Sequence, residues 1–149
     1  MISAPVVPFR VRGSDAWGSG DWRAPRGDRL HAGLDCVAAP GDPVYSPCSG
    51  VVRLGWCYRD DPRYRLVEIT GDDLIVRVLY VEPMVEDGDE VDSIKRIGSV
   101  QDIATKYGQG MTNHIHLDVR LRQVAQLQGR GKPVADPRWI NPRLVMRWR

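Results

Sequence analysis

The chain has 149 residues, of which 42% are apolar and 27% are charged, and its formal net charge is +2. A chain of this length can bury about 70% of the surface that its unfolded form exposes, so a hydrophobic core is expected. This near-average composition excludes disordered and collagen-like proteins, and the mild charge argues against a nucleic-acid-binding protein. We predict one domain over residues 1–149, with a core at about 17–142 and peripheral segments at 1–16 and 143–149.

The first residues, MISAPVVPFRVRGSDAWGSG, lack the basic and apolar regions of an export signal. No stretch approaches the roughly 20 apolar residues of a membrane span. We therefore predict that the protein is made in the cytoplasm and has no membrane span. The chain has one basic cluster near its end, made up of Arg138, Arg143, Arg147 and Arg149 with Trp139 and Trp148. We interpret this cluster as a solvated tail or as a surface for an anionic polymer.

Residues 1–30 are rich in Gly, Pro, Trp and Arg, which predicts irregular chain. Short β-branched and apolar runs between Gly, Pro and Asp then predict strands. The predicted strands are Val44–Tyr45, Gly50–Leu54, Arg65–Thr70, Leu74–Val81 and Ile115–Leu121, the third and fourth forming a β-hairpin. One helix is predicted at Val100–Tyr107, with Ser99 as its cap and Gly108 at its end. The fold predicted is mostly β, a compact antiparallel domain with one short helix.

All three histidines lie in two short segments that each also contain an Asp, HAGLD at 31–35 and HIHLD at 114–118. On a strand, residues i and i+2 share a face, so His114, His116 and Asp118 should project together. The aliphatic residues between them should point into the core. A lone His-x-His pattern is also typical of an exposed strand face.

The first segment needs a bend. Four residues of extended strand would separate His31 from Asp35 by about 13 Å, too far for two ligands of one metal. Gly33 supplies the freedom for that bend. The two segments together could gather two imidazoles and one carboxylate, a set typical of zinc in hydrolytic sites. The remaining histidine would then be free to move protons.

Four motifs in sequence resemble the lysostaphin/LytM-type zinc metallopeptidases, which cleave peptidoglycan peptides. They are DRLHAGLD at 28–35, PGDPVYSPCSGVV at 40–52, EDGDEVDS at 86–93 followed by Ile97-Gly98, and HIHLDV at 114–119. The resemblance covers about residues 17–142. It implies a compact antiparallel β-fold with a groove that holds the metal.

Position by position, the resemblance implies that His31, Asp35 and His116 bind Zn²⁺ and that His114 is the catalytic histidine. The family usually has a second catalytic His, and Glu82 stands in its place here. Alternation would put Glu82 on the face of Tyr80, so Glu82 is either a general base beside the zinc-bound water or a surface residue at a strand end.

The segment 99–110 is a second departure, since the family usually has a short Gly-rich turn there. A helix in this segment could form one wall of the groove, and Tyr107 and Met111 would either contact substrate or anchor the helix. Cys36, Cys48 and Cys57 are interpreted as buried thiols, because an odd number without CxxC spacing favours neither disulfides nor a zinc ribbon. Alternation turns Cys36 away from Asp35 and from the metal.

The sequence therefore predicts a zinc metalloendopeptidase that hydrolyses amide bonds in peptidoglycan stem or bridge peptides. Without an export signal, such an enzyme would reach the cell wall after lysis or as part of a virion, as a phage-type lysin does. Two rivals remain: a catalytically inactive module that binds wall polymer or a partner protein, and a different zinc hydrolase on a β scaffold. The sequence carries no prediction of the oligomeric state.

Overall fold

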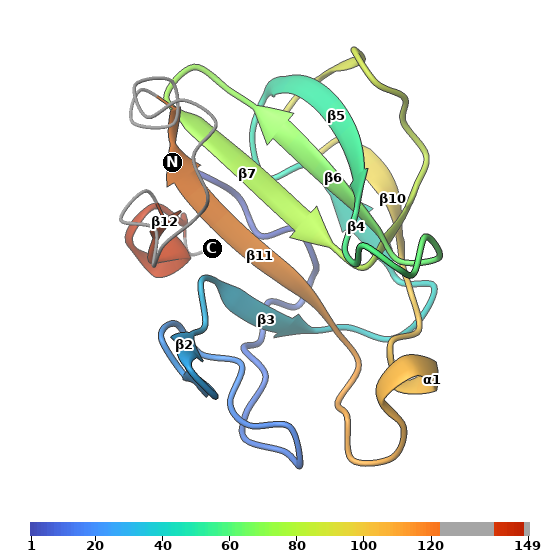
Figure 1. Ribbon diagram of the computed structural model, residues 1–149. Coiled ribbons are helices and arrows are strands. Elements are labelled where there is room, and N and C mark those ends of the chain that lie inside the picture. The colour runs from blue at the N-terminus through green and yellow to red at the C-terminus, as the bar shows by residue number, and fades with distance from the viewer. Residues whose placement is uncertain (123–138, 148–149) are drawn as a thin grey trace.

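The computed structural model describes residues 1–122 and 139–147 (Figure 1). Its main sheet has seven strands, in the order β12-β11-β7-β6-β5-β9, with β3 paired to β11 outside that path. These strands are β3 (Leu34–Val37), β5 (Gly50–Trp56), β6 (Arg65–Thr70), β7 (Leu74–Leu79), β9 (Glu90–Val91), β11 (His114–Leu121) and β12 (Trp139–Ile140). Every pairing of these strands is antiparallel.

Two smaller sheets complete the described part of the chain. One is three-stranded, with β10 (Arg96–Val100) between β4 (Pro43–Tyr45) and β8 (Val81–Pro83). The other pairs β1 (Pro25–Arg26) with β2 (Arg29–Leu30). The helical elements here are α1 (Ala104–Tyr107) and a 3-10 turn at Pro142–Leu144. Figure 1 shows α1 near the N-terminal end of β11.

Each predicted strand lies within, or largely within, an observed one. Arg65–Thr70 coincides with β6, and the hairpin to β7 is confirmed. The strand predicted for Leu74–Val81 is interrupted at Tyr80, whose φ of 69° lies in the left-handed region. The chain therefore leaves the main sheet at Leu79 and enters the three-stranded sheet at Val81.

The predicted start of the helix was wrong. Ser99 and Val100 belong to β10, where they pair with Glu82 and Val81. Val100 is buried in this sheet, and Ser99 is a strand residue rather than a helix cap. The helix begins at Ala104 without a side-chain cap, and it ends at Gly108, as predicted.

The core lies against the face of β11 that carries its aliphatic residues. Ile115, Leu117 and Val119 are fully buried there. Ile2 and Val6 are also part of the core, although the sequence places them in a peripheral segment. The division into core and peripheral segments stays a prediction. Among the described residues, no helix is long and apolar enough to cross a membrane.

Candidate metal centre

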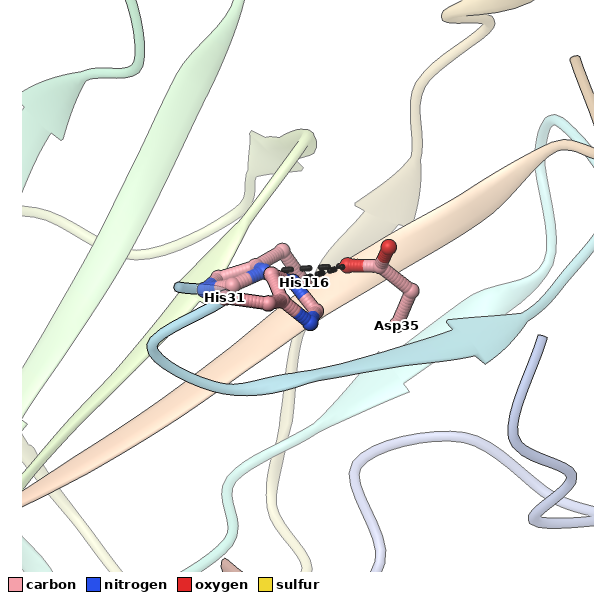
Figure 2. Close-up of side chains that lie close together, drawn as sticks. All are labelled: His31, Asp35 and His116. Atoms are coloured by element: carbon pink, nitrogen blue, oxygen red, sulfur yellow. Dashed lines mark hydrogen bonds and ion pairs between the residues drawn. The ribbon is translucent and has the colours of Figure 1, made fainter. Parts of the chain in front are cut away.

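The three predicted metal ligands meet at the junction of β3 and β11. Antiparallel pairing places Asp35 directly opposite His116. His31 precedes β3, and its Nε2 lies 3.1 Å from Asp35 Oδ1 and 3.0 Å from His116 Nδ1. The distance from His116 Nδ1 to Asp35 Oδ1 is 3.0 Å. Figure 2 shows both rings turned toward the carboxylate. These ligand atoms all lie within 4.8 Å of one another, close enough to hold one metal ion.

Gly33 makes this junction possible for a reason that differs from the expected one. Its φ is not in the left-handed region. A Cβ at this position would lie 2.2 Å from the carbonyl oxygen of Leu117 and 2.8 Å from His116 Nε2. The bend between His31 and Asp35 is confirmed, and glycine is required there because the backbone passes directly against β11.

Hydrogen bonds determine which ring nitrogens carry no proton and so are bare. His31 Nδ1 lies 2.8 Å from the carbonyl oxygen of Asp21, so it donates its proton there. His116 Nε2 lies 3.4 Å from Asp118 Oδ2 and faces it as a donor. The two nitrogens that face each other, His31 Nε2 and His116 Nδ1, therefore both present lone pairs, as does Asp35. Such a group needs a cation or a proton at its centre, and two imidazoles with a carboxylate fit Zn²⁺.

In the metal-free protein a proton fills that role. Burial lowers the pKa of His116, but its hydrogen bonds to Asp118 and Asp35 outweigh burial and raise this pKa to about 9. Burial likewise works against the charged form of Asp35, yet its contacts with His116 and His31 hold its pKa well below the usual range. Asp35 is thus a carboxylate at any physiological pH.

Two arginines bind the second oxygen of Asp35. Arg12 Nη2 lies 2.9 Å from Asp35 Oδ2, and Arg26 Nη2 lies 3.4 Å from it. Arg12 is only 3% exposed and also pairs with Asp15 at 2.6 Å. The arginines leave Oδ1 free to face the histidines, so they orient the carboxylate as a one-oxygen ligand. Sequence reasoning missed Arg12, which lies in the segment expected to be peripheral.

Asp118 supports His116 from the side opposite the ligand position. It is buried and accepts hydrogen bonds from Arg77 Nε at 2.9 Å and Nη2 at 2.7 Å. The Arg77 guanidinium in turn lies over the ring of Trp139, 4.6 Å from its centroid. A carboxylate behind a metal-binding histidine fixes the ring and raises its basicity. The alternation of β11 predicted this position for Asp118 but not its role.

His114 lies beside the ligands and presents a bare nitrogen. Its Nδ1 is 2.7 Å from the carbonyl oxygen of Thr112 and donates to it. Its Nε2 lies 3.6 Å from Asp35 Oδ2. The side chain is buried, and burial lowers the pKa of His114, so the ring is neutral near pH 7. The structure thus places His114 where the sequence expected it, and its catalytic role stays a prediction.

Glu82 does not lie with the other predicted site residues. It is exposed, pairs with Ser99 in the three-stranded sheet, and accepts a 3.4 Å hydrogen bond from Gln101. The expected alternation from Tyr80 to Glu82 fails because of the left-handed backbone at Tyr80. Tyr80 lines the cavity above the ligands, and Glu82 does not.

The cluster opens into a cavity of about 750 Å³. Tyr107 and Met111 line it, as the sequence suggested, and so do Trp17 and Trp139. Cys36 is fully buried in the core and does not line the cavity, which agrees with its expected orientation. Cys48 and Cys57 are half-buried rather than buried. The basic residues of the cavity are Arg12, Arg26, Arg29, Arg77 and Arg120.

Known proteins resemble this chain in sequence and in structure. Leukocyte cell-derived chemotaxin-2 of Bos taurus is 26% identical over 120 residues, which cover 79% of this chain and 78% of the chemotaxin. The Staphylococcus simulans antimicrobial peptidase lysostaphin superposes with a TM-score of 0.63 at 15% identity, over 93% of this chain and 50% of that chain.

Two further solved structures have the same fold. A mutant catalytic domain of the prophage-encoded M23 protein EnpA from Enterococcus faecalis has a TM-score of 0.59 at 23% identity, covering 94% of this chain and 95% of that chain. A zinc containing peptidase from Vibrio cholerae has a TM-score of 0.55 at 21% identity, covering 80% of this chain and 36% of that chain. The chain thus spans half or less of lysostaphin and of the Vibrio peptidase.

These likenesses confirm the predicted fold class, a mostly antiparallel β domain of the lysostaphin type. The family model that matches residues 45–135 is described as domain of unknown function (DUF8155) N-terminal domain. Because that match covers more than half of the chain, the protein belongs to the DUF8155 N-terminal domain family.

Proposed function

We propose that the chain is a zinc metallopeptidase that hydrolyses amide bonds in peptidoglycan stem or bridge peptides, as an endopeptidase. The observation that carries this proposal is the convergence of three lone-pair atoms, from His31, Asp35 and His116, at the floor of an open cavity. The lysostaphin-type fold and the zinc in the matching Vibrio peptidase support it.

Each residue has a defined task in this proposal. His31 Nε2, His116 Nδ1 and Asp35 Oδ1 would hold Zn²⁺, which would polarise the amide carbonyl and lower the pKa of an attacking water. His114 accepts a proton at its bare Nε2 and returns it to the leaving amine. The donation from its Nδ1 to Thr112 keeps that Nε2 available. Glu82 has no task here, because it is exposed and does not line the cavity.

The cell wall is the proposed place of action, with delivery after lysis or as part of a virion. The match of the prophage-encoded EnpA catalytic domain over 95% of its length supports a phage-type lysin. A digest of isolated walls from several bacteria, separated by mass, would identify the bond that is cut. Lysin activity requires cleavage of intact walls added from outside, and a chain that cleaves only soluble peptides contradicts this part of the proposal.

The test of the enzyme is metal content and release of free amines from isolated cell walls. About one zinc per chain is expected for a single three-ligand site. His114→Ala should keep its zinc and lose about 100- to 10,000-fold in turnover, the usual contribution of a general base. Arg53→Ala is the control, since Arg53 is exposed on β5 and does not line the cavity.

A second candidate function is a non-catalytic module that holds metal and binds wall polymer or a partner protein. The exposed position of Glu82 and the sequence match to a chemotaxin favour it. Such a module would bind zinc and cell walls and release no amines. Its wall affinity would also survive His114→Ala, whereas the enzyme would lose its turnover in that variant.

A further inference from the structure

Three tyrosines from separate segments join their hydroxyl groups at one wall of the cavity. The hydroxyl of Tyr58 lies 3.1 Å from that of Tyr80, and it is also hydrogen-bonded to the hydroxyl of Tyr107. All three residues line the cavity that holds the metal ligands. Tyr107 is a sequence candidate for substrate contact, whereas Tyr58 and Tyr80 are not, and the tasks proposed above involve none of the three.

Tyr80 reaches the cavity through an unusual backbone conformation. Its φ of 69° lies in the left-handed region, which is uncommon for a bulky residue. Two hydrogen bonds hold it there: the Tyr80 N–H donates to Arg65 O, and the Gln101 N–H donates to Tyr80 O, both at 2.9 Å. The left-handed residue separates β7 from β8 and leaves the ring on the cavity side.

The ring of Tyr80 lies directly beside His114. Their centroids are 5.7 Å apart and the planes meet at 83°, an edge-to-face contact. His114 Nε2 in turn lies 3.6 Å from Asp35 Oδ2. Tyr80 thus contacts His114, and His114 lies next to the ligand Asp35 in the same cavity.

The hydrogen bonds of the cluster run in one direction. Each hydroxyl has one proton, and Tyr58 donates its proton to the oxygen of Tyr80. The bond between Tyr58 and Tyr107 must therefore be donated by Tyr107. The proton of Tyr80 has no acceptor among residues 1–122 and 139–147. Successive donors polarise one another, which makes the last hydroxyl of the chain a stronger donor.

We propose that Tyr80 is a further catalytic residue, whose hydroxyl donates a hydrogen bond to the oxygen of the reacting amide, with Tyr58 and Tyr107 as positioning residues behind it. This proposal rests on the peptidase function. Negative charge develops on that oxygen during attack, so the bond strengthens in the transition state and the proton stays on Tyr80 throughout. Burial raises the pKa of Tyr80, which keeps the hydroxyl protonated.

The experiment compares Tyr80→Phe and Tyr58→Phe with the control Tyr45→Phe, since Tyr45 lies in β4 and does not line the cavity. Loss of one donor to a developing oxyanion lowers kcat by about 100- to 1,000-fold, and KM should hold. Tyr58→Phe keeps its ring and loses only the polarising bond, so a smaller loss of about two- to tenfold is expected. Tyr45→Phe should equal the wild type.

A second measurement separates this role from packing and from the peptidase function. A phosphinate peptide carries a tetrahedral, negatively charged group in place of the amide, and its uncleavable neutral analogue is a ketomethylene peptide. Tyr80→Phe should weaken phosphinate binding to the zinc-loaded chain by at least tenfold and leave the neutral analogue unchanged. Zinc content and thermal stability report whether the variant is folded.

The outcomes divide cleanly. Equal losses for both ligands, or no loss for the phosphinate, overturn the role of Tyr80, as does a wild type that binds no phosphinate. A wild type that releases no amines, yet binds phosphinate in a Tyr80-dependent way, refutes the peptidase and retains Tyr80 as the donor to an anionic ligand at the metal centre.

Discussion

The two faces of β11 follow different rules. On one face, Ile115, Leu117 and Val119 are fully buried among aliphatic neighbours. On the other, His114, His116 and Asp118 each have defined polar partners. Burial alone specifies the first face, and any apolar side chain of similar volume would serve it. The second face requires particular donors and acceptors at particular positions, so its residues are not interchangeable.

The polar face is also balanced in charge without a metal. Asp35 is held by Arg12 and Arg26, and Asp118 is held by Arg77. A buried carboxylate without a cation would destabilise the fold, and here each one has a cation. The fold should therefore form in the absence of metal, in contrast to small zinc domains that are unfolded without it. The following variants test how far the two faces are independent.

The largest effect on stability should come from the apolar face. Leu117→Ala should lower the free energy of unfolding by about 2–5 kcal/mol, because it removes a fully buried side chain and leaves a cavity. Chemical denaturation measures this loss. The folded fraction should still bind zinc with the affinity of the wild type. A loss of zinc affinity equal to that of a ligand variant would show that the two faces are coupled.

The sequence predicted both faces of β11 because strand alternation is a local property. It also predicted the bend before Asp35, since four extended residues cannot bring His31 and Asp35 together. It did not predict Arg12, whose contact with Asp35 joins segments 23 residues apart in the chain. Nor did it predict Tyr80, because its left-handed backbone is held by hydrogen bonds to Arg65 and Gln101, which are distant in the sequence.

Gly33→Ala should affect both faces at once. The new Cβ would lie 2.2 Å from Leu117 O and 2.8 Å from His116 Nε2, so β3 and β11 must move apart. Overpacking of this kind costs about 1–3 kcal/mol. Denaturation and zinc titration of one sample measure both consequences. Gly88→Ala is a control for the loss of a glycine, because its added Cβ would meet no atom within 4 Å. The control is imperfect, since a φ of 88° is strained for alanine. An unchanged zinc affinity in Gly33→Ala would contradict the close approach.

Asp118→Asn should act on the polar face alone. The variant keeps an oxygen near His116 but removes the carboxylate behind the ring, which typically weakens metal binding by about 10- to 100-fold. Competition with a chelating dye measures the affinity. Asp72→Asn, in the exposed β6–β7 turn, is the matched control and should bind zinc as the wild type does. Equal affinities in the two variants would remove Asp118 from the site.

The pH dependence of metal binding tests whether a proton occupies the centre before the metal binds. Because the pKa of His116 is raised to about 9, a metal must displace a proton at lower pH. Affinity should fall about tenfold for each pH unit below about 9 and level off above it. Calorimetry in buffers of different ionisation enthalpy should detect about one proton released per metal bound near pH 7.

Because the pKa of His116 is raised, the stability of the chain should change with pH in opposite directions with and without zinc. A raised folded-state pKa stabilises the metal-free chain fully below the ordinary histidine value of 6.5, and this stability is lost as the pH rises through about 9. The zinc-loaded chain should gain stability over that window, since the cation replaces the proton without competition. Thermal unfolding of both forms from about pH 6 to 9 measures the divergence. Parallel curves would mean that no proton occupies the centre, and the bare nitrogens of His31 and His116 would then need another explanation.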